Sequence, residues 1–538
     1  MKVKQYIQSI SQNSLSEINR QIAEVCGIAD FFSERSELDY CESYSREDKY
    51  EYGDWQTNCD LTNSIVQQIK TDLSPQVVIE PTCGKGNFIL SVLDTFDTVT
   101  DIYAVEIYKP YLQQLKHEIL QRYLDGRYVH KVNIHLVHGN VFEIDWSKIG
   151  TSVRNKNVLV IGNPPWVTNS SLCRVKSDNL PKKFNIKQLS GIAAMTGKGN
   201  FDIAEYICLQ MIENFAQCNT TFALLLKNSV IRQLCYSMPK MHLPISALSQ
   251  YQIDAKKEFG ASVDASLFTF QSEKGEACCD VYDFYTHKFR YQYGWVNGKF
   301  VSDTQTYKKT EYIDGLSPIV WRSGIKHDCQ SVLELTKEGD TYYNKVGERV
   351  TIEDTFVYPY VKSSDIQSCY LTGHNRFVIV PQRNINDNTE ALLHTAPLTY
   401  EYLLSHKDYF EQRKSSIYKN RPAFSIFGIG GYTFKPYKII ISSLYKSKKF
   451  VLFSPINGKC VIPDDTCYMV GFDRYEDALN ALEILENPMV SEFMQSISFD
   501  DSKRVVTKDL LMRINLHRVD TVKRVFALNQ QQSLLFEE

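Results

Sequence analysis

The sequence predicts an α/β protein in which a doubly wound, mainly parallel sheet is followed by a second, β-rich domain. In the first half of the chain, short apolar runs alternate with stretches of helical periodicity, the pattern of consecutive strand–helix–strand units. After about residue 270 helical periodicity becomes sparse, and short runs rich in Tyr, Val and Ile are broken by Gly, Asn, Asp and Pro. The length of 538 residues also exceeds that of one ordinary domain.

The elements of the first domain follow in a regular order. Continuous apolar runs predict buried strands, and apolar residues spaced about 3.6 apart predict helices. The expected strands are 76–80, 101–106, 133–139, 157–162 and 221–227. The expected helices are 86–96, about 110–123 and 201–215. Ligands of such sheets bind at the carboxyl ends of the strands.

These patterns divide the chain into three segments. Residues 1–45 are polar and are expected to form an N-terminal helical extension. The first domain is expected over 46–285 and the second over 286–538, where DALNALEILEN (477–487) is one of few predicted helices.

Composition narrows the class of protein. Hydrophobic residues make up 43% of the chain and charged residues 23%, as in globular proteins. No uninterrupted apolar run reaches the roughly 18 residues of a membrane span, and the start of the chain lacks an apolar segment of signal-peptide length. The 14 cysteines are scattered without a Cys-x-x-Cys, which favours reduced thiols in the cytoplasm. We therefore expect no membrane and no metal.

Three successive strands are predicted to end in groups suited to a nucleoside-like ligand. In IEPTCGKGNF (79–88), Glu80 stands at a strand tip, where an acid suits a positively charged ligand. Gly84 and Gly86 allow a tight turn there, without the three-glycine spacing of a dinucleotide fingerprint. Glu106 ends the next strand, where a carboxylate can bind a ribose diol.

The third strand ends in HGNVF (138–142), which places Asn140 and Phe142 where an adenine ring could be hydrogen-bonded and covered. Each of these groups alone fits a strand-end cap or a turn. Their succession on three strand ends favours a nucleoside-like cofactor. The fourth strand then ends in GNPPW (162–166).

The succession EPTCGKGNF, AVE, HGNVF and GNPPW resembles the S-adenosylmethionine-dependent amino-methyltransferases. Its order, with a long tail after NPPW, resembles the gamma-class, TaqI-type N6-adenine DNA methyltransferases. The resemblance covers about 50–270 and is weaker over 350–515. Further similar motifs are YGDWQTNCDLTNSIVQQI (52–69), GNFDIAEYI (199–207) and KEFGASVDASLFTF (257–270). The family usually has an aspartate where this chain has Asn140, whose amide oxygen can still accept a hydrogen bond but carries no charge.

The resemblance implies a Rossmann-like S-adenosylmethionine-dependent methyltransferase fold for 46–285 and a DNA target-recognition domain for 286–538. It implies that the cofactor is S-adenosylmethionine. The residues expected to bind it are Thr57, Glu80, Cys83, Gly84, Gly86, Glu106, Asn140, Val141, Phe142 and Asn163.

The residues Asn163, Pro164, Pro165 and Trp166 are the candidate catalytic set. The amino group of adenine is a poor nucleophile, because its lone pair is delocalised into the ring. Two acceptors that take both amino hydrogens would pull the nitrogen towards tetrahedral geometry. The Asn163 side-chain oxygen is one, and the Pro164 carbonyl, held outward by the rigid Pro-Pro pair, is the other. Trp166 would then offer the base a flat face. The alternative is a Pro-Pro turn with a packed Trp.

A base inside a duplex cannot reach such a pocket, so the enzyme must flip it out. By its match to the family's motif, Phe259 is the candidate to cover the other face of the flipped base. Ordinary core packing is the alternative for this ring.

A basic, aromatic stripe from Arg413 to Lys449 is the candidate DNA contact. It contains nine basic residues and no acidic one, with seven aromatic residues interleaved. Such a stripe is typical of contacts with a phosphate backbone, although a solvated face over a core strand would look similar. Lys446, Lys448 and Lys449 are the residues we expect to bind DNA.

We therefore expect a site-specific methyltransferase that acts on adenine N6 in double-stranded DNA, serves a bacterial restriction–modification system, and lies in the cytoplasm with the nucleoid. A cognate restriction endonuclease would act separately, since no Pro-Asp…Glu-x-Lys segment precedes the core. A protein-glutamine or RNA amino-methyltransferase would share 80–166 but typically lacks so long a tail. A non-catalytic DNA-binding subunit would not need the intact NPPW.

Overall fold

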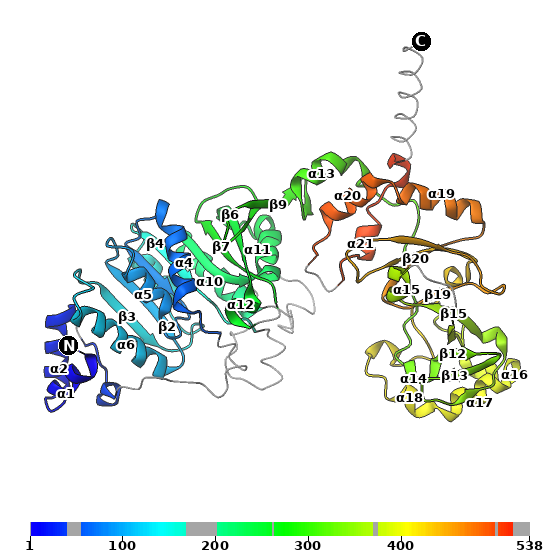
Figure 1. Cartoon of the computed structure of the whole chain (residues 1–538), viewed down its shortest axis with the longest axis horizontal. Coiled ribbons are helices and arrows are strands. Elements are labelled where there is room, and N and C mark those ends of the chain that lie inside the picture. The colour runs from blue at the N-terminus through cyan, green and yellow to red at the C-terminus, as the bar shows by residue number, and fades with distance from the viewer. Residues whose placement is uncertain are drawn as a thin grey trace, which may run out of the picture. The chain divides into compact units, whose positions relative to one another are not determined.

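The computed structural model describes residues 2–28, 30–39, 55–167, 202–260, 263–368, 375–500 and 504–519. The chain divides into two compact units, Met1–Phe300 and Val301–Glu538 (Figure 1). Each unit has its own sheet structure and its own core.

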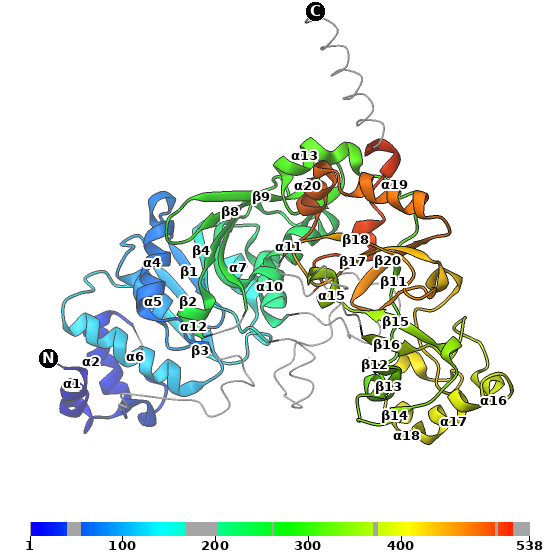
Figure 2. The ribbon, with the colours of Figure 1, turned by 45° about the vertical axis from the view of Figure 1, so that its right-hand side comes forward.

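The first unit is built on one ten-stranded sheet with the order β10-β9-β8-β6-β7-β5-β4-β1-β2-β3 (Figure 2). Strands β1 to β5 pair in parallel, and β7 runs antiparallel between β5 and β6. The strands are β1 Val77–Glu80, β2 Asp101–Glu106, β3 Asn133–His138, β4 Asn157–Gly162, β5 Asn219–Lys227, β6 Ser246–Ile253, β7 Ala265–Gln271, β8 Cys278–Asp283, β9 Phe289–Val296 and β10 Lys299–Val301.

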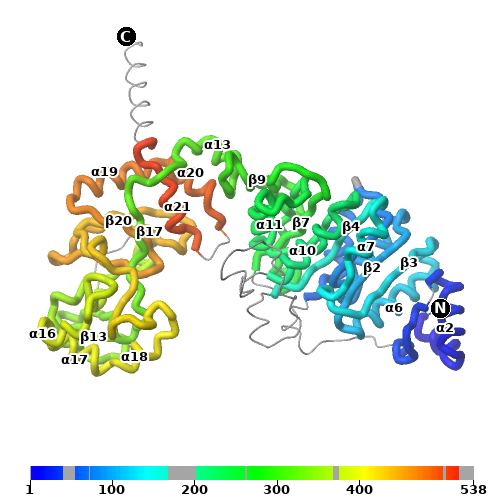
Figure 3. Tube along the Cα trace, turned by 180° about the vertical axis from the view of Figure 1, so that it is seen from behind, coloured from blue at the N-terminus to red at the C-terminus, as the bar shows by residue number. Residues whose placement is uncertain are grey.

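Helices pack on the sheet because its central strands are apolar on both faces. All four residues of β1 are buried, as expected for a covered parallel strand. Side chains of α1, α2, α4, α5 and α6 share one core cluster with Val78 and Leu159. Helix α10 contacts both α7 and α11, and these three helices lie apart from that cluster (Figure 3). The helices are α1 Val3–Ile10, α2 Leu15–Cys26, α4 Cys59–Ile69, α5 Asn87–Leu93, α6 Lys109–Leu124, α7 Trp146–Ser152, α10 Ile203–Phe215, α11 Asn228–Met241 and α12 Ala255–Phe259.

The predicted α/β fold class is confirmed, and the five expected strands match β1 to β5 closely. The sequence did not predict α7, a helix of 7 residues that is too short to show periodicity. It begins where the Asp145 side chain accepts a hydrogen bond from the backbone N–H of Lys148 at 3.2 Å.

The first sheet continues past the expected boundary at 285/286. Strand β9 pairs antiparallel with β8, and β10 extends the same sheet, so the first compact unit reaches Phe300. The change of rhythm near residue 270 therefore falls within the sheet, after β7 and before the last three strands, β8 to β10. The N-terminal helices also belong to this unit, because Ile7, Ile18 and Ile22 lie in its core.

The second unit contains two sheets, in agreement with the β-rich expectation. Their orders are β11-β20-β17-β18 and β14-β13-β12-β16-β15-β19. The strands are β11 Arg322–Ser323, β12 Glu334–Glu338, β13 Thr341–Asn344, β14 Arg349–Val350, β15 Val357–Val361, β16 Arg376–Ile379, β17 Tyr437–Ser442, β18 Phe450–Phe453, β19 Ile462–Pro463 and β20 Cys467–Phe472. The helices are α13 Thr304–Thr310, α14 Gln330–Leu333, α15 Ser363–Ser368, α16 Leu392–Thr395, α17 Pro397–Ser405, α18 Lys407–Glu411, α19 Tyr475–Leu485, α20 Pro488–Ile497 and α21 Lys508–Leu511.

Two structural absences apply to the described part of the chain. No helix there is long and apolar enough to cross a membrane. No group of His, Cys, Asp and Glu there is arranged to hold a metal ion.

One lysine of the basic stripe lies inside the second unit. Lys438, in β17, has an exposed fraction of 0%, and its Nζ donates to the backbone oxygen of Lys435 at 2.6 Å. Because burial removes the ammonium from water, the pKa of Lys438 falls to about 8. Lys438 therefore cannot contribute to a surface contact with phosphate.

Replacing Lys438 with Met should remove a pH dependence of stability. Between about pH 8 and pH 10.5 the folded lysine is neutral while the unfolded one is protonated, so the free energy of unfolding of the natural chain rises with pH in this window. Lys438→Met should lack this rise, so its stability relative to the natural chain should be greatest at pH 7 and should fall as the pH approaches 10.5. Urea unfolding at pH 7, 9 and 10.5 measures both effects, and parallel curves for the two proteins would contradict the burial argument.

Candidate active site

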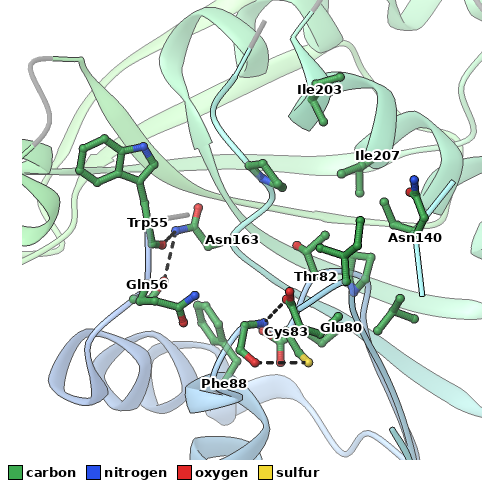
Figure 4. Close-up of a pocket in the computed structure, with 18 of the residues that line it drawn as sticks. Trp55, Gln56, Glu80, Thr82, Cys83, Phe88, Asn140, Asn163, Ile203 and Ile207 are labelled. Carbon is green, nitrogen blue, oxygen red and sulfur yellow. Dashed lines mark hydrogen bonds between the residues drawn. The ribbon is translucent and has the colours of Figure 1, made fainter. Parts of the chain in front are cut away.

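A pocket opens at the carboxyl ends of the central parallel strands of the first unit (Figure 4). It encloses about 840 Å³ of atom-free space, including its open mouth. Its walls are the loop after β1, the ends of β2 and β4, the turn after β3, part of α10, and a segment before α4. The lining residues are 55–57, 80–84, 87, 88, 105–107, 139–142, 163, 165, 203 and 207.

Most of the residues expected at the cofactor lie together in this pocket. Those that line it are Thr57, Glu80, Cys83, Gly84, Glu106, Asn140, Val141, Phe142, Asn163 and Pro165. Gly86, Pro164, Trp166 and Phe259 lie outside its lining. Gly86 lies behind the lining, where its backbone packs against Leu115. Its φ is +78°, and a Cβ there would lie 2.3 Å from the Leu115 side chain, so only glycine fits.

Glu106 fixes the wall between β1 and β2. Its Oε2 accepts a hydrogen bond from the backbone N–H of Gly84 at 2.9 Å, and its Oε1 accepts one from that of Tyr108 at 2.8 Å. These two bonds fix the orientation of the carboxylate at the pocket wall. A carboxylate in this position suits the hydroxyl groups of a ribose diol.

Glu80 is a buried acid, and no described Lys, Arg or His lines the pocket beside it. Its exposed fraction is 1%, and its Oε2 has no hydrogen-bond partner among the described residues. The pKa of Glu80 is raised well above its ordinary value, first because burial disfavours the charged form and second because Glu106 repels it. Among the described residues, the pocket lining contains no Lys, Arg or His. A cationic ligand would therefore be favoured here.

The Asn140 side chain, which was expected to face adenine, forms a hydrogen bond within the turn after β3. Asn140 Oδ1 accepts a hydrogen bond from the backbone N–H of Phe142 at 3.0 Å. Phe142 in turn packs edge-on against Tyr206, with ring centroids 5.4 Å apart. The Asn140 amide can also donate a hydrogen bond, which an ionised aspartate cannot do.

Asn163 presents an unpartnered acceptor to the pocket. Its Nδ2 donates to the backbone oxygen of Trp55 at 3.1 Å and to Thr57 Oγ1 at 3.2 Å (Figure 4). Because a carbonyl oxygen can only accept, the amide cannot be flipped. Asn163 Oδ1 is consequently buried with no partner among the described residues. A buried acceptor in this state is costly unless a ligand donates to it.

Sequence reasoning missed most of the segment that holds Asn163, residues 55–58, which we call the strap. Gln56 Oε1 accepts a hydrogen bond from the backbone N–H of Lys85 at 3.0 Å, and Asn87 Nδ2 donates one to the backbone oxygen of Thr57 at 2.7 Å. These bonds anchor the strap to the glycine loop and to α5. The strap has no secondary structure, so no periodicity marks it in the sequence.

Trp166 and Phe259 meet each other directly. Their ring centroids are 5.1 Å apart with an interplanar angle of 70°. The Trp166 Nε1 donates to the Leu225 oxygen at 3.4 Å, and 8% of Trp166 is exposed. A base sandwiched between two rings would need parallel planes about 7 Å apart. The two rings that were expected to cover a base are thus adjacent, but they form an edge-to-face pair.

The candidate DNA-binding lysines lie in the second unit, on the turn between β17 and β18. Lys446 and Lys449 are exposed. Lys448 differs from the expectation, since only 7% of its side chain is exposed and its Nζ lies 3.5 Å from Asp500 Oδ1.

The chain is similar to a Type II methyltransferase in sequence and to a restriction-modification enzyme in fold. No family model matches it. The Type II methyltransferase M.NspV of Nostoc sp. is 36% identical to it over 472 residues, which are 87% of this chain and 97% of that protein. The Type IIL restriction-modification enzyme MmeI, solved in complex with DNA, matches with a TM-score of 0.51 and 12% identity, over 85% of this chain and 65% of its own. The similarity to MmeI shows a shared fold.

Binding of S-adenosylmethionine, the expected cofactor, should release a proton from Glu80. The raised pKa favours the protonated form of the free carboxyl, and a bound cation lowers that pKa, so affinity should increase as pH rises towards the pKa of the free form. Calorimetry in buffers of different ionisation enthalpy counts the protons released. The natural chain should release up to about one proton more than Glu80→Gln. Equal proton counts for the two proteins would contradict this assignment.

Proposed function

The chain belongs to the Type II methyltransferases, and on that premise we propose that it methylates the N6 amino group of adenine at specific sites in double-stranded DNA. Its cofactor is S-adenosylmethionine. We further propose that this reaction is the modification step of a restriction–modification system, with a separate nuclease as the partner activity.

The pocket fits S-adenosylmethionine on observations independent of the comparisons. The orphaned Oε2 of Glu80 suits a positive charge, and the fixed carboxylate of Glu106 suits a ribose diol. The turn at Asn140 and Phe142 offers hydrogen-bonding groups and a ring edge for adenine. When bound, the cofactor supplies a methyl group made electrophilic by its sulfonium.

One observation carries the proposed chemistry: Asn163 Oδ1 is buried with no partner in the part of the chain that the structure describes, and two hydrogen bonds from Nδ2 set the orientation of the amide. In the proposed reaction this oxygen accepts one hydrogen of the target amino group. The Pro164 carbonyl accepts the other, which draws the nitrogen lone pair out of conjugation. No strong base is needed, because the methylated nitrogen loses its proton readily.

Two further observations favour DNA as the substrate. The relative M.NspV is a Type II methyltransferase, and MmeI, which shares the fold, was solved with DNA bound. The second unit also supplies a surface for the target, including the exposed Lys446 and Lys449. An RNA or protein-glutamine substrate would leave the second unit without an assigned role. Asn163-Pro164-Pro165-Trp166 is more typical of adenine than of cytosine methylation.

Expression in a host without DNA methylation should produce N6-methyladenine at a defined sequence in the host genome. Asn163→Ala should lose this signal, since removing one group that stabilises the transition state costs roughly 10²–10³ in rate. S-adenosylmethionine affinity of the purified variant should remain close to that of the natural chain. Sequencing the genomic DNA is the measurement, and unmodified adenines beside methylated cytosines would overturn the adenine assignment.

Neutralising Lys446 and Lys449 together should weaken DNA binding and reduce its salt dependence. Two lost phosphate contacts should lower the slope of log affinity against log salt by about 2. Lys308→Ala with Lys309→Ala, an exposed pair on α13, is a matched control with the same change in charge. Fluorescence titration of a labelled duplex at several salt concentrations measures the slopes. If both variants keep the natural slope, the turn between β17 and β18 is ordinary solvated surface.

A further inference from the structure

A second set of hydrogen bonds joins the strap to the helix that carries Phe259. Asn58 Nδ2 donates to Glu258 Oε2 at 3.2 Å, although the two residues are 200 positions apart in the chain. The Tyr285 hydroxyl donates to the other carboxylate oxygen, Oε1, at 3.0 Å. Both oxygens of Glu258 therefore bind segments outside α12.

The directions of these bonds are fixed by neighbouring groups. Asn58 Oδ1 accepts from the backbone N–H of Leu61 at 2.8 Å, where it caps α4, so its Nδ2 must face Glu258. The Tyr285 hydroxyl accepts from the backbone N–H of Asp254 at 3.3 Å, so its own hydrogen is directed to Glu258. Neither partner can reverse its role without losing a bond.

Glu258 is sheltered enough for these bonds to matter. Its side chain is 11% exposed, whereas that of the adjacent Lys257 is 70% exposed. The Lys257 Nζ lies 3.8 Å from Glu258 Oε1 and 5.2 Å from the centroid of the Tyr285 ring. Hydrogen bonds to an ionised carboxylate are roughly twice as strong as neutral ones.

The two ends of this linkage adjoin the two functional parts of the site. Asn58 follows Thr57, whose hydroxyl holds the Asn163 amide. Glu258 precedes Phe259, whose ring contacts Trp166. One carboxylate thus connects the acceptor that faces the amino group with the aromatic pair beside it.

We propose that Glu258 is a positioning residue, which through Asn58 and Tyr285 holds the strap and the Phe259 helix in register, so that Asn163 Oδ1 stays aimed at the target amino group. This inference rests on the proposed function. Without the linkage the strap can shift relative to α12, and a displacement of about 1 Å at a reacting centre can cost about 100-fold in rate.

The test compares Glu258→Ala, Glu258→Gln, Tyr285→Phe and the double variant Glu258→Ala/Tyr285→Phe with the natural chain. Glu273→Ala removes an exposed carboxylate of the same unit and serves as the control. Transfer of radioactive methyl groups to unmethylated genomic DNA gives kcat and the apparent KM for DNA. Thermal unfolding is measured on every variant.

Glu258→Ala should lower kcat by about 10–100-fold with little change in the KM for DNA, and its melting temperature should fall by no more than about 4 °C. Glu258→Gln keeps one acceptor oxygen and should recover part of kcat. Tyr285→Phe should reduce kcat less than Glu258→Ala does. The double variant should be no slower than Glu258→Ala, because both changes break one linkage.

Two results would overturn the inference alone: a natural chain that methylates DNA while Glu258→Ala stays within about twofold of the Glu273→Ala control, or additive losses in the double variant. A natural chain that methylates no DNA would instead overturn the proposed function and the inference with it.

Discussion

The candidate active site depends on the orientation of one amide. Asn163 Nδ2 gives both of its hydrogens to the strap, one to a carbonyl oxygen and one to a hydroxyl. The carbonyl cannot donate, so the amide oxygen is left facing the pocket. The parallel sheet sets the position of Asn163 at the end of β4, and the strap sets its direction. If the strap is displaced, the same residue becomes an ordinary strand-end polar group.

The electrostatics of the pocket complement this geometry. Two carboxylates, Glu80 and Glu106, line it with no basic side chain among the residues that the structure describes. Within that part of the chain Glu106 has hydrogen bonds to both oxygens, whereas Glu80 Oε2 has none. Burying an unpaired acid costs free energy, which a protonated carboxyl reduces and a bound cation offsets. The site is therefore suited to a cofactor that carries positive charge and a ribose. The acceptor at Asn163, at the end of β4, is suited to a donor.

The sequence predicted the parts of the molecule that are set locally. Each of β1 to β4 is a short apolar run followed directly by a functional group, so the strands and most of the lining could be placed before the structure was known.

Side chains whose surroundings come from distant segments could not be placed from the sequence. Lys438 and Lys448 look like surface lysines in the sequence, but β17 buries one and Asp500 pairs with the other. The edge-to-face contact of Trp166 with Phe259 and the bond from Asn58 to Glu258 also join distant segments. The sheet passed the expected boundary because β8, β9 and β10 still belong to it, so the change of rhythm near residue 270 preceded the end of the first unit.

The most direct measurement of the central claim is a crystal structure of the chain with its DNA target and a cofactor analogue that lacks a transferable methyl group. In that structure we expect a flipped adenine whose N6 lies about 2.7–3.2 Å from Asn163 Oδ1, with the amide still bonded to the strap. An adenine N6 that does not contact Asn163 Oδ1, or an amide turned so that Nδ2 faces the base, would contradict it.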